Sequence, residues 1–108
     1  MDDLRNFYYF ENLNDEQFKL LSSFARKNKY EKDSILFYEK EVPTSLILLV
    51  EGTLKVYKTD MKNNEIILNR FRPMSMIAEM AILEGIPYPA SAVFETNGTI
   101  IEIDFERF

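Results

Sequence analysis

The sequence LILLVEGTLKVY, residues 46–57, decides the fold class of this 108-residue chain. Its first part, Leu46–Val50, is a continuous apolar run with the length of a buried strand. The run is broken at Gly52, after which apolar Leu54 and Val56 alternate with polar residues, as they do in a strand with one buried face. The stretch therefore predicts two successive short strands.

Further short strands are predicted on both sides of this stretch. They lie at residues 34–38, 65–71, 90–95 and 99–104. A polar segment at 60–64 separates residues 54–57 from 65–71, and Asn97-Gly98 is a dipeptide typical of a two-residue hairpin turn. We expect a hairpin at each place. About seven or eight short strands at regular spacing predict a sandwich, barrel or jelly roll.

Two helices are expected among the strands. Asn14 and Gln17 match a capping box at the start of an amphipathic helix, which we place at about 15–26. The basic residues at its expected C-terminal end are Arg26, Lys27 and Lys29. A second, short helix is expected over residues 76–84, with Gly85 as the residue that ends it.

Composition excludes several classes of function. The net charge is −5, and the chain has neither cysteine nor histidine. Disulfides, thiolate catalysis and the commonest metal ligand and general base are therefore absent, and we expect no enzyme activity. An acidic chain with scattered Lys and Arg is also a poor DNA binder by itself. No apolar run approaches the roughly 20 residues of a membrane span, so we expect a cytoplasmic protein.

The order and spacing of five segments resemble the cyclic-nucleotide-binding domain superfamily, and most closely the effector domains of the cyclic-AMP receptor protein/Fnr family of bacterial transcription regulators. The segments are 34–41, 46–57, 65–71, 76–92 and 99–105. The resemblance implies a mainly β fold over residues 1–108. That fold is an antiparallel β-roll (jelly-roll-like, a double-stranded β-helix) with a leading α-helix and a short internal helix.

The resemblance also implies partners. A domain of this kind senses a small-molecule effector and signals to a DNA-binding domain. In the family a dimerisation helix and a helix-turn-helix follow the roll, and neither is in this chain. We therefore expect DNA contact only through a domain outside the chain, and a homodimer in the full-length protein. Residues 105–108 are expected to begin another helix, with Phe105 and Phe108 in the dimer contact.

A phosphate-binding cassette for cyclic AMP or cyclic GMP is the candidate site that the resemblance implies. The matching residues are Ala78, Glu79, Met80 and Ala81 at its start, and Ala90, Ser91 and Ala92 at its end. Alanine stands at position 78 where the family has glycine. The family's phosphate-binding arginine falls on Ala90, or on Pro89 if the loop differs by one residue. Without that cation the cyclic phosphate loses its strongest partner, which argues against cyclic-nucleotide binding.

The missing arginine leaves three questions open, each with two alternatives. Arg70 or Arg72 either supplies the missing cation or is a solvated strand end. The methionines Met74, Met76 and Met80 either line a pocket for a neutral ligand or fill gaps in the core. The domain is either a sensor or a degenerate scaffold or dimerisation module. An open pocket would favour the sensor, and one filled by side chains would favour the scaffold.

Overall fold

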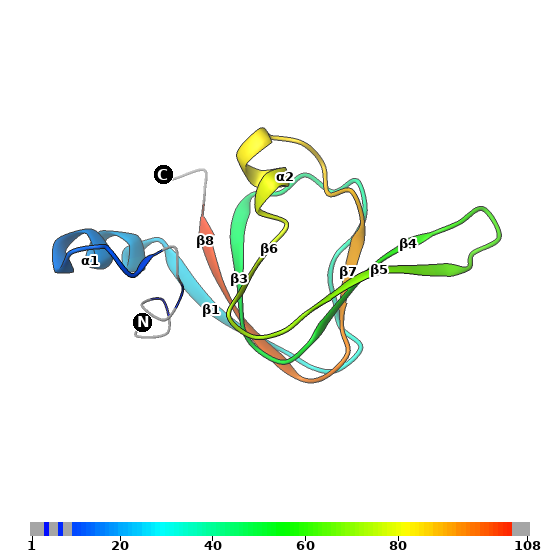
Figure 1. Ribbon diagram of the computed structural model, residues 1–108, viewed down its shortest axis with the longest axis horizontal. Helices are drawn as coiled ribbons and strands as arrows, with labels where there is room; N and C mark the ends of the chain where they lie inside the picture. Colours follow the sequence, from blue (N-terminus) through cyan, green and yellow to red (C-terminus); the bar gives the residue numbers. More distant parts are fainter. Residues whose placement is uncertain (1–3, 5–6, 8–9, 105–108) are drawn as a thin grey trace.

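Two four-stranded antiparallel sheets face each other in the computed structural model, which describes residues 4, 7 and 10–104 (Figure 1). The first sheet has the order β1-β8-β3-β6 and consists of β1 (Ala25–Tyr30), β8 (Gly98–Asp104), β3 (Ser45–Glu51) and β6 (Ser75–Ile77). The second has the order β2-β7-β4-β5 and consists of β2 (Ile35–Phe37), β7 (Ser91–Phe94), β4 (Leu54–Thr59) and β5 (Glu65–Phe71). With α1 (Asp15–Ser23) and α2 (Glu79–Glu84), these sheets confirm the predicted mainly β roll with a leading and an internal helix.

The hydrophobic core is divided by the first sheet into two clusters. The interior cluster, between the sheets, consists of Phe37, Ile47, Leu49, Leu54, Ile77, Ala81, Tyr88, Ala92, Phe94 and Ile100. The outer cluster, under α1, consists of Leu4, Phe7, Phe18, Leu21, Leu48, Ile101 and Ile103. Successive residues of β8 point to opposite faces, so this strand contributes to both clusters. Among the described residues, no helix is long and apolar enough to cross a membrane.

The leading helix is shorter than predicted. The capping box is confirmed, since the Asn14 side chain accepts from the Gln17 amide at 2.7 Å and the Gln17 side chain accepts from the Asn14 amide at 3.1 Å. The helix ends at Ser23, however, and the expected extension to residue 26 is wrong.

The basic segment after α1 is instead an edge strand. Residues Ala25–Tyr30 form β1 and pair antiparallel with β8, with Arg26 opposite Glu102. Their side chains lie 3.3 Å apart in an ion pair. Tertiary pairing with a buried strand satisfies the backbone here and overrides local helix preference. Lysines on a sheet edge also oppose pairing with other chains, a role that the sequence pattern did not indicate.

The expected helix over 76–84 contains two elements. Its first residues belong to β6, where Ile77 pairs with Ile47 of β3 and α2 begins only at Glu79. Between them, Ala78 adopts the left-handed conformation with φ of 52°. Gly85 ends α2 in the left-handed conformation, as predicted.

One expected hairpin is confirmed and the other is wrong. The β4 and β5 strands pair antiparallel and extend away from the rest of the molecule (Figure 1). The Asn97-Gly98 segment joins β7 to β8, which lie in different sheets. Both edges of β8 are already paired, so β7 pairs elsewhere and the dipeptide makes a crossing between sheets. The helix expected from residue 105, and the dimer contact of Phe105 and Phe108, lie outside the described residues.

A second crossing between sheets packs against this one at Gly52, which joins β3 to β4. Its φ is +88°, and a Cβ there would lie 2.5 Å from the Asn97 carbonyl oxygen and 2.8 Å from the Gly98 Cα. Gly85 also has positive φ, but a Cβ there would have no heavy atom within 4 Å. Replacing each glycine by alanine therefore separates two costs. Both variants would have a left-handed alanine, but only the Gly52 variant would also have a steric clash.

We predict that Gly52→Ala destabilises the domain more than Gly85→Ala does. The Gly85 variant should lower the free energy of unfolding by about 1–2 kcal/mol, the cost of a left-handed alanine. The Gly52 variant should lower it by about 1–3 kcal/mol more, because backbone atoms must move to admit the methyl group. Urea unfolding of the two variants measures the difference. Equal losses of unfolding free energy would contradict the close contact between Gly52 and the Asn97-Gly98 backbone.

Candidate functional site

A cavity of about 140 Å³ opens inside the roll beside the start of α2. It is lined by Phe37, Val56, Phe71, Ile77, Ala78, Pro89 and Ala90. These residues come from four strands and from the two segments that flank α2. Each of the seven side chains is apolar, so the lining offers a ligand contact area and no charged group.

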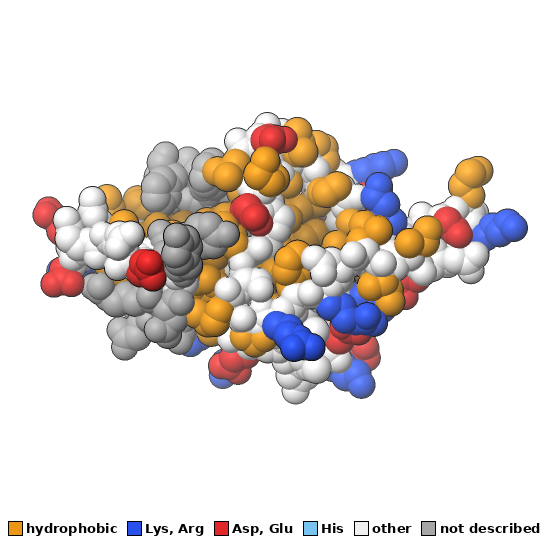
Figure 2. Space-filling view, in the orientation of Figure 1, with side chains coloured by type: hydrophobic (Ala, Val, Ile, Leu, Met, Phe, Trp, Pro, Cys, Tyr) orange, Lys and Arg blue, Asp and Glu red, His pale blue; other side chains and the backbone are white. Residues whose placement is uncertain are grey.

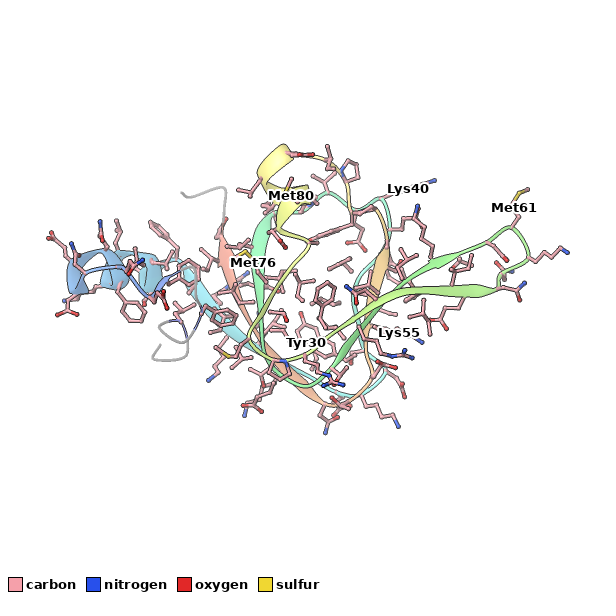
Figure 3. All side chains as sticks on the ribbon, in the orientation of Figure 1. Tyr30, Lys40, Lys55, Met61, Met76 and Met80 are labelled. Carbon is pink, nitrogen blue, oxygen red and sulfur yellow. The ribbon has the colours of Figure 1, made fainter. Side chains whose placement is uncertain are left out.

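The start of the candidate cassette lies at this cavity. Ala78 lines it directly and precedes the first turn of α2. Glu79 opens the helix and is half-buried, whereas Met80 points outward and is 58% exposed (Figure 3). The Ala81 amide donates to the Ala78 carbonyl at 3.1 Å, so this backbone donor at the start of the cassette already has a partner.

The end of the cassette reaches the same cavity through one residue. Ala90 is 3% exposed and faces Ala78 across the lining. Ala92 is fully buried and pairs with Val56 of β4. The Ser91 hydroxyl oxygen accepts a hydrogen bond from the Glu39 amide at 2.8 Å, which ties β7 to the residues after β2. The fold thus brings Ala78 and Ala90 together and engages Ser91 in a structural bond.

Neither proposed substitute cation lines the cavity. Arg70 forms an ion pair with Glu95, with 2.9 Å between Nε and Oε1. Arg72 is exposed at the end of β5. The nearby Lys55 is paired with Glu65 at 2.8 Å (Figure 3). The geometry therefore agrees with an ion pair for Arg70 and a solvated strand end for Arg72. Neither arginine supplies a cation to the cavity.

The methionines do not line the cavity either. Met76 packs against the outer cluster, which agrees with the gap-filling alternative. Met74 and Met80 are exposed, so neither the pocket alternative nor the gap-filling alternative fits these two residues. The actual walls are the aromatic and branched residues Phe37, Val56 and Phe71. Strand alternation indicated that Val56 is buried, but no local pattern could show that these three side chains meet.

Tyr88 does not line the cavity but packs against Phe37, which does. Its ring stacks on Phe37 with 3.8 Å between centroids and 8° between planes. Burial, and then the negative charges of Glu102 and Glu41, raise the pKa of Tyr88 to about 12. A phenol buried beside two carboxylates resists ionisation, because the phenolate would be poorly solvated and repelled.

Known proteins share both the sequence pattern and the fold. Residues 27–108 match the family model described as cyclic nucleotide-binding domain. A comparison with curated proteins found no significant match. Among solved structures, the sensor domain of the transcriptional regulator DNR from Pseudomonas aeruginosa is similar, with a TM-score of 0.84 and 21% identity over 95% of this chain and 69% of that chain.

Two further structures have the same fold. The N-terminal domain of a transcriptional regulator from Streptomyces coelicolor A3(2) matches with a TM-score of 0.82 and 24% identity over 99% of this chain and 75% of that chain. The catabolite activator protein of Thermus thermophilus matches with a TM-score of 0.76 and 24% identity over 90% of this chain. The chain spans 46% of that chain, and less than half of two other matched proteins.

We predict that the free energy of unfolding falls between pH 10 and 12, and that Tyr88→Phe reduces the fall. The folded pKa is about 12 and the ordinary value is 10. In this range the folded state keeps a proton that the unfolded state releases, so rising pH favours unfolding. Urea unfolding at several pH values measures the effect. An identical fall in the unmodified domain and in Tyr88→Phe would contradict this prediction. Tyr30→Phe is the control, because burial also raises the pKa of Tyr30.

We also predict that Ser91→Ala lowers the free energy of unfolding by about 1 kcal/mol, because the partly buried amide of Glu39 loses its acceptor. Ser75→Ala, in β6 and away from this bond, is the matched control. Thermal or urea unfolding measures both variants. If Ser91→Ala were as stable as the control, the hydroxyl would be free to serve a ligand instead.

Proposed function

Because the chain belongs to the cyclic nucleotide-binding domain family, we propose that it is the effector-sensing domain of a Crp/Fnr-type transcription regulator. In this proposal residues 1–108 bind a small molecule inside the roll and signal to a DNA-binding domain outside the chain. Sensor and N-terminal domains of transcriptional regulators have the same fold, which supports the assignment.

The open cavity beside α2 is the observation that carries this proposal. It lies where both ends of the cassette meet, and its walls leave about 140 Å³ free. A module kept only for its surface has no need of this space, since protein interiors are otherwise closely packed. An unfilled pocket at the junction of helix and sheets therefore favours a sensor over a scaffold.

Cyclic AMP and cyclic GMP fit this cavity poorly. The lining has no cation to neutralise a cyclic phosphate, since Ala90 occupies the arginine position. Pockets for ligands of drug size usually enclose about 300–1,000 Å³, at least twice the space present here. The Ser91 hydroxyl is also engaged with Glu39. The effector in this proposal is therefore a smaller molecule without an anionic group.

Signalling would begin at α2. Ala78 contacts the cavity and Ala81 is buried in the interior cluster, so the helix is coupled to whatever fills the space. The other side of α2 exposes Met80 and Leu83, with Ile86 just beyond its end. A ligand that binds more tightly when α2 is in one position would increase the population of that position. The exposed surface of α2 would change with it.

A scaffold or dimerisation module is the second candidate, and the exposed apolar surface favours it. Hydrophobic side chains gather over α2 and near the base of the β4–β5 hairpin (Figure 2). Three consecutive residues of β5, Ile66, Ile67 and Leu68, are each about half exposed. Exposed apolar residues in such numbers are typical of an interface. Both candidates use this surface, and only the sensor needs the cavity.

Ligand binding by the 108-residue domain tests the proposal. We expect uncharged small metabolites, and neither cyclic AMP nor cyclic GMP, to shift the amide resonances of Ala78, Ala90 and α2 together. The Ala90→Arg variant restores the family's cation. Nucleotide binding by this variant alone would identify the missing guanidinium as the defect. Nucleotide binding by the unmodified domain would contradict our exclusion of cyclic nucleotides as effectors. If no compound binds, the scaffold is favoured.

A further inference from the structure

Few polar atoms of the backbone reach the surface of the cavity, which is formed almost wholly by apolar atoms. Three lining residues lie in paired strands, with Val56 opposite Ala92, Phe71 opposite Leu54, and Ile77 opposite Ile47. The Ala78 carbonyl accepts the Ala81 amide. Strand pairing and the helix turn use much of the local backbone hydrogen-bonding capacity. A polar molecule entering the cavity would lose its bonds to water and gain few in return.

The same surroundings make the cavity a poor site for water. A buried water needs two to four polar partners, and an apolar cavity of about 150 Å³ stays dry and admits benzene or xenon in a known case. The cavity here has about 140 Å³ and seven apolar lining residues. The cavity is partly open, since Pro89 in its lining is exposed. An apolar molecule of matching size would gain dispersion contacts with the walls and displace water that has few polar partners there.

The space is held open by neighbouring contacts. The Phe37 ring is stacked on Tyr88, which restrains it from turning into the cavity. Ala78 is committed to a left-handed turn between β6 and α2. At Ala90 the side chain ends at Cβ, and a longer side chain would enter the space. Stacked, strained and small residues thus preserve a volume that close packing would otherwise fill.

We propose that this cavity binds an uncharged apolar molecule of about the size of a benzene ring. This inference rests on the proposed sensing function and names the chemical class of the effector. The two aromatic walls, Phe37 and Phe71, suit a flat ring or a short branched hydrocarbon. A carboxylate, phosphate or ammonium group finds no partner among the lining residues and is rejected by its desolvation cost.

Binding of benzene, indole and xenon to the domain, followed by methyl and amide NMR, tests the inference. We expect saturable shifts at Ala78, Ala90, Ile77 and Val56. Ala90→Leu fills the cavity and should weaken binding by at least about tenfold. Val93→Leu, in β7 and outside the lining, is the control and should leave binding unchanged. If Ala90→Leu fails to fold, Val56→Leu fills the space from the opposite wall.

Other outcomes separate this inference from the proposed function. If cyclic AMP or a polar metabolite shifts the cavity residues and no apolar probe does, sensing stands and the apolar ligand class is overturned. If the apolar probes shift only exposed residues such as Ile66 and Ile67, without saturation, the inference is likewise overturned. If no compound of either kind binds, both the inference and the sensing function fail.

Discussion

The burial of most of β8, between two strands and two clusters, is the constraint on which the rest of the structure depends. Its two edges are hydrogen-bonded to β1 and β3, and its two faces supply residues to both clusters. Ile100 faces the interior, whereas Ile101 and Ile103 face the outer cluster. Because both edges and both faces of β8 contact other elements, the positions of those elements are largely fixed.

Several features follow from that burial. The basic segment after α1 becomes a strand because it is the partner that completes one edge of β8. The outer face needs a cover, and α1 supplies it with Phe18 and Leu21. With both edges of β8 occupied, β7 joins the other sheet beside β4. The space between the sheets, and hence the candidate site, exists because β7 and β8 separate after Phe94.

The candidate site is apolar because small and hydrophobic side chains form all of its lining. The family's position for a glycine and its position for an arginine are both alanine here, at Ala78 and Ala90. The cavity that these two alanines line is wholly apolar. Charge lies elsewhere, in surface pairs such as Arg70 with Glu95, which contribute little to stability and nothing to the cavity.

The sequence by itself determined the fold class, the confirmed capping box at Asn14, the β4–β5 hairpin and the glycine that ends α2. Each depends on residues that are close in the chain, so local propensity and alternation suffice. Only the tertiary structure decided that Ala25–Tyr30 is a strand, that Asn97-Gly98 crosses between sheets, and that Phe37, Val56 and Phe71 meet around one cavity. The physical reason is that these features depend on long-range pairing and packing, which join residues that no local pattern connects.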